Sequence, residues 1–232
     1  MIRLSLFILL ISIGALWPTN ANSSQKHNST ELQLLADLSP TSCHFSGTFS
    51  QQKNVKGLPV PLLSTGDFFF SCDLGLIWNT LSPFSEALLY INASNNFRID
   101  DKGNVEALSG VAHYSMSKIF LKLLKGDTQY FADAFSVVLI PNSDTIELTP
   151  ESSFMKKGIE HIHFNKNKDE QGNIQLEIRV MDITGQMTKV EINNISEFDI
   201  SGKRQAFEQC EKAYPSPLQW CKGLRSPLHF QR

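Results

Sequence analysis

Two neighbouring segments of the chain carry the pattern of paired β-strands. Residues 44–51 alternate strictly between apolar or glycine residues and polar ones, and residues 64–71 continue the pattern. The positions that share one face are Phe45, Gly47 and Phe49 in the first segment and Gly66, Phe68 and Phe70 in the second. A period of two is typical of a strand with one buried face. A loop rich in glycine and proline separates the segments, so they are predicted to form an antiparallel hairpin.

One register of this hairpin opposes large side chains to glycines and also brings two cysteines together. The opposed pairs are Phe49 with Gly66, Gly47 with Phe68, Phe45 with Phe70 and Cys43 with Cys72. Spacing alone allows about three pairings of four cysteines, and the register favours Cys43–Cys72, which leaves Cys210–Cys221. The chain has no CxxC pair and no zinc-finger spacing, so disulfides are expected rather than a metal site.

The rest of the chain reads as more strands with a few helices. Short connections predict about ten strands, all antiparallel. In the hairpin that follows residue 75, we expect Trp78 to oppose Leu89 and Leu76 to oppose Ile91. Spacings of three and four residues predict helices over 31–38, 116–125 and 203–213.

A large sheet with an apolar face needs a cover, and the three predicted helices are the candidates. Two arrangements satisfy this requirement. In one, the sheet folds on itself as a closed sandwich with a filled core. In the other, the helices form a lid over an apolar cavity that admits a ligand.

Charge and the N-terminus restrict the partners and the compartment. The 232 residues carry 21 Lys plus Arg against 23 Asp plus Glu, a net charge of −2, which argues against nucleic acid and against electrostatic adsorption to an anionic membrane. Residues 1–21 have a basic start, an apolar stretch from Leu4 to Leu16 and a plausible cleavage point after Ala21, so they are predicted to be a signal peptide. We expect residues 22–232 to form a single soluble domain in the periplasm and to act as a monomer.

The chain offers little support for catalysis. His161 and His163 lie two residues apart and share one face of a predicted strand, but no third metal ligand accompanies them. The serines lie in no Gly-x-Ser-x-Gly elbow, and no spacing pairs two carboxylates. We therefore expect neither an enzyme nor a cofactor.

Several short motifs, taken in order, resemble a known family. They are Phe49-x-Gln51-x-Lys53, Pro61-Leu62-x-Ser64-x-Gly66-x-Phe68, Gly75-Leu76-Ile77-Trp78-x-Thr80-x-x-Pro83-Phe84, Leu148-Thr149-Pro150 and Met181-Asp182-x-x-Gly185-x-x-Thr188. Their order and spacing resemble the periplasmic outer-membrane lipoprotein carriers of the LolA type, and most closely the LolA-related branch. The resemblance covers residues 30–196 and leaves out the C-terminal helix and the tail, residues 197–232.

This resemblance implies a curved antiparallel sheet of about eleven strands, which forms a half-open β-barrel covered by a helical lid. Such carriers take acylated lipoproteins from an inner-membrane exporter and deliver them to an outer-membrane receptor. No cofactor takes part. A glycolipid or another lipid is as compatible with these residues as a lipoprotein.

The expected ligand-binding residues follow from the alternation and from the predicted lid helix. They are Phe45, Phe49, Phe68, Phe70, Leu76, Trp78, Leu89, Ile91, Ile119, Phe120 and Leu123. Many members of the family carry a basic residue six positions before the tryptophan, where it helps to hold the lid. Here that position is Cys72, so the lid is expected to be held differently.

One alternative of a different class stays open. The chain could be a secreted β-sandwich that binds another protein, or a hydrolase without acyl cargo. A filled core with a polar cleft would favour that alternative, whereas a helix-covered apolar cavity would favour the carrier.

Overall fold

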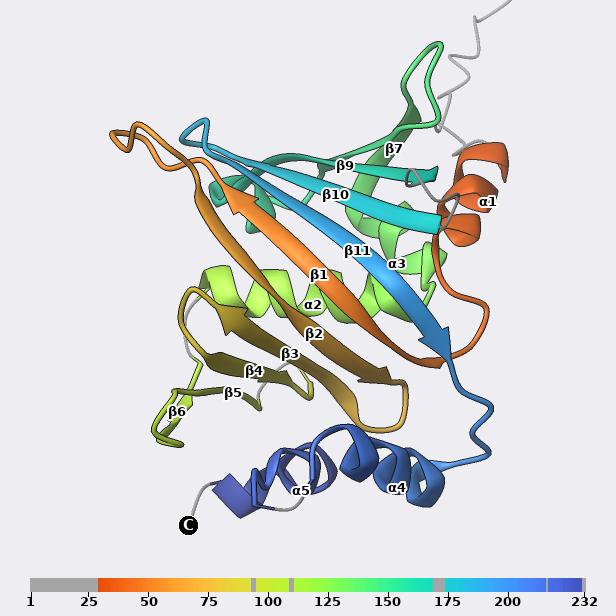
Figure 1. Ribbon diagram of the computed structural model, residues 1–232. Helices are drawn as coiled ribbons and strands as arrows, with labels where there is room; N and C mark the ends of the chain where they lie inside the picture. Colours follow the sequence, from red (N-terminus) through yellow and green to blue (C-terminus); the bar gives the residue numbers. More distant parts are fainter. Residues whose placement is uncertain (1–28, 93–94, 109–110, 169–173, 216, 231–232) are drawn as a thin grey trace, which may run out of the picture.

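The computed structural model describes residues 29–92, 95–108, 111–168, 174–215 and 217–230. Within these ranges eleven strands form one antiparallel sheet in the order β6-β5-β4-β3-β2-β1-β11-β10-β9-β8-β7 (Figure 1). The strands are β1 (His44–Lys53), β2 (Leu62–Ser71), β3 (Gly75–Ser82), β4 (Glu86–Tyr90), β5 (Asn96–Ile99), β6 (Val105–Ala107), β7 (Phe135–Leu139), β8 (Ile146–Pro150), β9 (Ile159–Lys168), β10 (Ile174–Asp182) and β11 (Met187–Glu197).

The sheet is strongly curved but does not close. Its outer strands, β6 and β7, are not paired with each other, so the sheet is an open half-barrel. Irregularities in the ladder occur between β1 and β11, between β2 and β3, and between β9 and β10. Such irregularities bend a strand and increase its local twist. The predicted fold class is therefore confirmed, and the sandwich arrangement is wrong.

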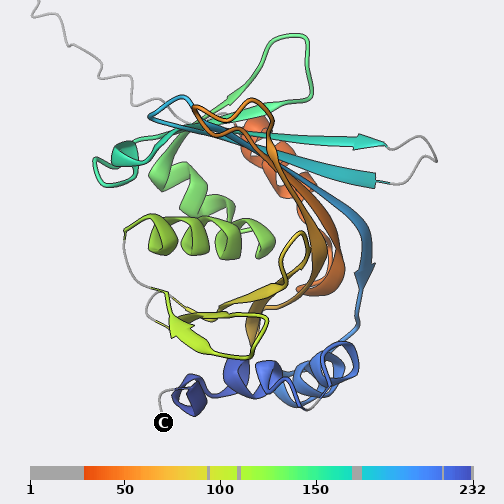
Figure 2. The same cartoon turned by 60° about the vertical axis from the view of Figure 1, so that its left-hand side comes forward.

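The helices lie on both sides of the sheet. They are α1 (Ser29–Leu38), α2 (Val111–Leu124), α3 (Thr128–Ala134), α4 (Lys203–Ala213) and α5 (Trp220–Arg225), with short 3-10 turns at Met155–Lys157 and Pro227–Phe230. Figure 2 shows the sheet curving around α2, while α4 and α5 lie outside the curve. We call the side that holds α2 the concave face and the other side the convex face.

The predicted pairing of β1 with β2 is confirmed. Gly47 opposes Phe68, Phe49 opposes Gly66, and Phe45 opposes Phe70. Just beyond the ladder, Cys43 and Cys72 form a disulfide with their Cα atoms 5.5 Å apart. Cys210 and Cys221 form the second disulfide, with a Cα separation of 5.9 Å. Both predicted disulfides are present.

The pairing of β3 with β4 differs from the predicted register by one residue. The observed pairs include Leu76 with Tyr90 and Trp78 with Leu88. Because a one-residue shift moves every side chain of a strand to the other face, Leu89 and Ile91 lie on the convex side. Their assignment to the concave face is wrong. Residues 87–91 are apolar at every position, so their pattern selects no register.

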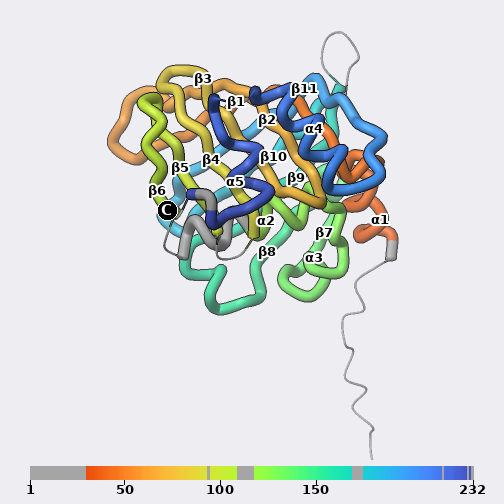
Figure 3. The backbone as a smooth tube through the Cα atoms, turned by 90° about the horizontal axis from the view of Figure 1, so that it is seen from below, coloured from red at the N-terminus to blue at the C-terminus, as the bar shows by residue number. Residues whose placement is uncertain are grey.

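The convex face of β2 to β5 has a core of its own beneath α4 and α5. Figure 3 shows these helices from below, lying across the sheet. The buried members of this core include Phe69, Ile77, Leu89, Phe97, Ala206 and Leu224. The helix predicted at 203–213 therefore covers the convex face and is no part of a lid. Helix α5 was not among the predicted helices.

A polar contact joins the end of α4 to the sheet. The Tyr214 hydroxyl donates to Asp67 Oδ1, which also accepts from Asn79 Nδ2 at 3.1 Å. Burial, and then the hydrogen bond to Asp67, raise the pKa of Tyr214 well above its usual value. Burial, and then the charge of Glu86, raise the pKa of Tyr90 to about 12.

The predicted signal peptide, residues 1–21, lies outside the described residues. Among the described residues, no helix is long and apolar enough to cross a membrane.

We expect Tyr214→Phe to lower the free energy of unfolding by about 1–3 kcal/mol at neutral pH, because Asp67 loses a donor at a partly buried site. Denaturant titration measures this change. Tyr90→Phe is the matched control, because no hydrogen bond of the Tyr90 hydroxyl is found in the described residues; its loss should be smaller. Equal losses would contradict the role given to the Tyr214–Asp67 bond.

The same pair predicts a pH dependence. A folded-state pKa above the value of about 10 of an unfolded tyrosine means that the stabilisation is complete below that pH and is lost as pH rises further. Stability should therefore fall at alkaline pH, and less steeply in the Tyr214→Phe chain. Unfolding curves measured at several alkaline pH values test this expectation.

Candidate functional site

The central strands place a group of aromatic side chains on the concave face. Phe49 is stacked on Trp78, with ring centroids 3.8 Å apart and an interplanar angle of 21°. Phe68 lies 5.8 Å from Trp78 and 5.9 Å from Phe45, whose ring is 5.2 Å from Phe70. All five rings are buried. They form one continuous apolar wall across β1, β2 and β3.

Two glycines make room for this wall. A Cβ atom at Gly47 would lie 2.8 Å from the Phe68 ring, and one at Gly66 would lie 2.8 Å from the Phe49 ring. Each glycine therefore lets the opposing ring lie flat against the backbone of the neighbouring strand. This explains why the sequence pairs large residues with glycine here.

Helix α2 supplies the cover. Ile119 and Leu123 are buried against the concave face, and the half-buried Phe120 lies over Trp78 with ring centroids 5.7 Å apart. Leu35 and Leu38 of α1 and Phe131 of α3 belong to the same apolar cluster. These three helices fill the hollow of the half-barrel (Figure 2).

Beneath α2, the other half of the sheet adds residues that the sequence analysis did not name. A small apolar pocket is lined by Ile119, Phe120, Leu123, Ile162, Phe164, Ile178 and Val180. Its volume is about 10 Å³, close to the space of one water molecule. Ile162 and Phe164 of β9 and Ile178 and Val180 of β10 alternate with residues of the other face, so the alternation within 162–164 and 174–180 is the signal that could have identified these residues.

Nine of the eleven predicted ligand-binding residues lie together. Eight are buried in the concave cluster, namely Phe45, Phe49, Phe68, Phe70, Leu76, Trp78, Ile119 and Leu123, and Phe120 packs against them. Leu89 and Ile91 lie on the other side of the sheet, as described above.

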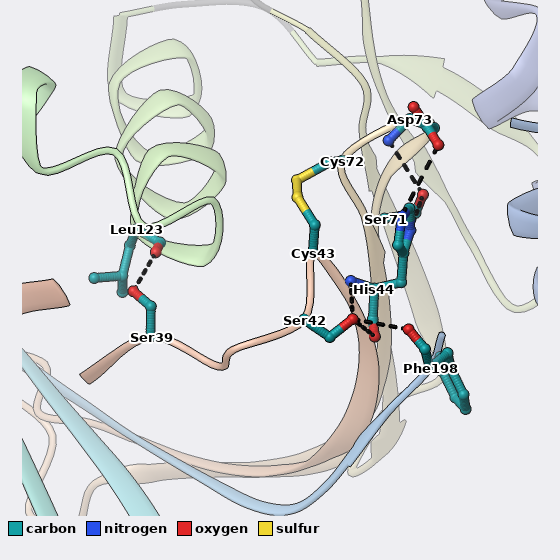
Figure 4. The surroundings of a disulfide bond; sticks show 9 residues. All are labelled: Ser39, Ser42, Cys43, His44, Ser71, Cys72, Asp73, Leu123 and Phe198. Atoms are coloured by element: carbon teal, nitrogen blue, oxygen red, sulfur yellow. Dashed lines mark hydrogen bonds and ion pairs between the residues drawn. A yellow bond between two sulfur atoms is a disulfide. The ribbon is translucent and has the colours of Figure 1, made fainter. Parts of the chain in front are cut away.

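The C-terminal end of α2 is held by short polar contacts. Ser39, in the link between α1 and β1, donates through its hydroxyl to the Leu123 carbonyl oxygen at 3.0 Å (Figure 4). Lys122 Nζ lies 2.5 Å from Asp127 Oδ2. The hydrogen bond from Lys122 holds the pKa of Asp127 below its usual value. The Cys43–Cys72 disulfide lies in the same region and ties the Ser39 link to β2.

A serine, a histidine and an aspartate meet near this disulfide but form no open site. His44 Nδ1 is 3.0 Å from Ser71 Oγ, and His44 Nε2 is 3.9 Å from Asp73 Oδ2 (Figure 4). The Ser71 side chain has no exposed surface, and its oxygen also accepts the Asp73 backbone N–H at 3.2 Å. A nucleophile needs access to its substrate. We interpret this group as a structural network on the convex side.

The histidine pair has a structural partner as well. The rings of His161 and His163 are stacked with centroids 4.6 Å apart, and His163 Nε2 is 2.8 Å from Glu147 Oε2. Across the part of the chain that the structure describes, no group of three or more His, Cys, Asp or Glu side chains is arranged to hold a metal ion.

Comparison with known proteins finds similarity in structure only. No protein-family model matches the chain, and no curated protein is similar to it in sequence. Solved structures of the LolA superfamily are similar to this one. A LolA superfamily protein from Nitrosomonas europaea has a TM-score of 0.42 at 10% identity, over 74% of this chain and 94% of that chain.

Two further structures show the same level of similarity. A DUF1329 family protein from Desulfovibrio piger has a TM-score of 0.43 at 13% identity, over 78% of this chain and 97% of that chain. A domain from Vibrio parahaemolyticus, assigned to outer membrane lipoprotein sorting, has a TM-score of 0.43 at 10% identity, over 79% of this chain and 97% of that chain.

We expect Gly66→Ala to lower the free energy of unfolding by about 1–3 kcal/mol, because the added methyl group would overlap the Phe49 ring and the Asn79 carbonyl oxygen. Gly158→Ala is the matched control: its Cβ would meet nothing within 4 Å, and its φ of −134° suits alanine. The control should change stability by no more than about 0.5 kcal/mol. A Gly66→Ala chain as stable as the control would refute the close packing described here.

Proposed function

We propose that this chain is a periplasmic carrier that binds the acyl chains of lipoproteins, or of a related lipid or glycolipid, on its concave face and shuttles them from the inner to the outer membrane. The observation that carries this proposal is the apolar concave face of an open sheet, which helices α1, α2 and α3 cover. The motifs that resemble LolA-type carriers point to the same function.

The chemistry of the face suits an acyl chain. All seven residues that line the pocket under α2 are apolar, and the aromatic wall extends this surface to Phe45. Burying a methylene group contributes about 0.8 kcal/mol, so a chain of about sixteen carbons carries on the order of 12 kcal/mol of transfer free energy. That is enough to displace packed side chains and still leave net binding.

Binding requires α2 to move. The pocket of about 10 Å³ is far below the roughly 300–1,000 Å³ of ligand pockets. The structure is therefore the closed form of the proposed carrier, in which Ile119, Phe120 and Leu123 occupy the place of the cargo. Displacing α2 costs part of the free energy gained from the acyl chain, and this keeps the cargo releasable.

A carrier of this kind needs neither a catalytic group nor a cofactor. In this proposal residues 1–21 direct export and residues 22–232 act as one monomeric carrier domain. An inner-membrane exporter loads the cargo and an outer-membrane receptor takes it up. The single open sheet rules out the sandwich architecture of the alternative, and the apolar lining under α2 supports the carrier over a hydrolase.

Phe120→Asp tests the proposed binding face. A charge placed at the apolar contact between α2 and the sheet should weaken uptake of a fluorescent fatty acid by about tenfold or more, because charge is costly to bury beside an acyl chain. Phe84→Asp is the matched control: Phe84 is 82% exposed in the β3–β4 loop, and this variant should bind normally. Thermal unfolding establishes that both variants fold.

Native mass spectrometry of the protein purified from its own compartment then identifies the cargo. A bound lipid or acylated protein, absent from the Phe120→Asp chain, would support the proposal. An empty wild-type protein that also takes up no fatty acid would overturn it.

Ser39→Ala tests how α2 is held. Loss of the hydrogen bond to the Leu123 carbonyl removes about 1 kcal/mol from the closed form, so fatty acid should enter up to about fivefold faster. Stopped-flow fluorescence measures this rate. Ser143→Ala is a control: its hydroxyl donates to Ile140 O in an exposed turn, away from α2. An unchanged rate in Ser39→Ala would show that this bond does not limit opening.

A further inference from the structure

The loop between β1 and β2 extends beyond the end of the sheet (Figure 1), and several apolar side chains in and beside it are exposed. Leu58, Val60, Leu62 and Leu63 are between 49% and 67% exposed. Ile183, 56% exposed, lies in the neighbouring turn between β10 and β11. We call these five residues the apolar tip. Large exposed apolar patches mark sites of interaction with proteins or membranes.

Backbone pairing holds the two parts of the apolar tip side by side. Lys53, at the end of β1, pairs with Thr188 of β11, and the Asn54 N–H donates to the Met187 carbonyl oxygen at 2.8 Å. The β1–β2 loop and the β10–β11 turn therefore leave the sheet together, as Figures 1 and 2 both show.

The apolar tip exposes apolar side chains on both faces of the β1–β2 hairpin. Leu62 and Leu63 are successive residues of β2, so their side chains point to opposite faces of the hairpin. The interfacial region of a bilayer surrounds an inserted tip, and so matches a hairpin that exposes apolar side chains on both faces.

The whole chain has a net charge of −2, which argues against adsorption by charge alone, but the charges beside the apolar tip are mostly basic and suit an anionic surface once apolar side chains insert. From Gln52 to Gly66 the only charged residues are Lys53 and Lys56, and both are exposed. The neighbouring turn adds one acid, Asp182, whose negative charge interacts with Lys53, so the two loops together, with two lysines and one aspartate, keep a net charge of +1. Lysines that flank inserted apolar residues are attracted to anionic headgroups.

We propose that the apolar tip inserts into the interfacial region of an anionic phospholipid bilayer, with Lys53 and Lys56 at the level of the headgroups. This contact goes beyond the carrier function and needs no acyl cargo. It gives the chain a membrane-facing end, formed by the loops β1–β2 and β10–β11.

Vesicle sedimentation tests the proposal with the exported chain, after mass spectrometry has confirmed its N-terminus. The vesicles contain phosphatidylethanolamine and phosphatidylglycerol, and phosphatidylcholine vesicles serve as the neutral comparison. We expect binding to the anionic vesicles. Val60→Asp should weaken it by about tenfold or more, and Lys56→Gln by about fivefold.

Two variants with the same substitutions elsewhere serve as controls. Val138→Asp changes an exposed valine of β7, and Lys168→Gln changes an exposed lysine at the other end of the sheet. Both should bind vesicles as the wild type does. If the controls lose as much binding as Val60→Asp and Lys56→Gln, the assignment to the apolar tip is wrong.

Two further outcomes separate lipid binding by the apolar tip from protein binding and from the carrier function. If the wild type binds no pure lipid vesicle but binds membranes that retain their proteins, the apolar tip contacts a protein and the proposal is overturned. Fatty-acid uptake by Val60→Asp is measured in parallel. Normal uptake with lost vesicle binding separates this proposal from the carrier function, so that either can fail alone.

Discussion

The pairing of phenylalanine with glycine across β1 and β2 is the contact on which the rest of the structure depends. Gly47 and Gly66 let the Phe68 and Phe49 rings lie against the neighbouring strand, and Trp78 stacks on Phe49 in turn. The resulting wall of rings is apolar, and Ile119, Phe120 and Leu123 of α2 pack against it. Because a core tolerates little overlap, a methyl group at either glycine would push the rings toward α2.

The sequence predicts the parts of the fold where only one register fits. In β1 and β2 the glycines, rings and cysteines agree on a single alignment, and the structure confirms it together with both disulfides. In β4 the run from Ala87 to Ile91 is apolar on both faces, so either register buries a hydrophobic row. The observed register buries Ala87 and Leu89 in the convex core beneath α4 and α5. These two helices come from the far end of the chain, so the sequence of β4 gives no local signal of the register.

The two faces of the sheet are closed in different ways. On the convex face, α4 and α5 are pinned by the Cys210–Cys221 disulfide and by the buried Tyr214–Asp67 bond. On the concave face, the described polar contacts at the C-terminal end of α2 include the hydrogen bond from the Ser39 hydroxyl and a half-exposed ion pair between Lys122 and Asp127. Partly exposed ion pairs contribute little to stability. Among the described residues, the convex layer thus has a disulfide and a buried hydrogen bond, whereas the polar contacts of α2 on the concave side are partly exposed, as the proposed opening of the carrier requires.

The Cys43–Cys72 disulfide is one of the covalent and polar links at the end of α2, and it can form only after its two thiols are oxidised. It joins the short link that carries Ser39 to the end of β2, directly beside the end of α2. Thiols stay reduced in the cytosol and are oxidised after export. In the proposed exported carrier, a newly made chain would therefore lack the cross-link beside α2 until it has crossed the membrane, and the concave face would become complete only in the compartment where the proposed cargo is met.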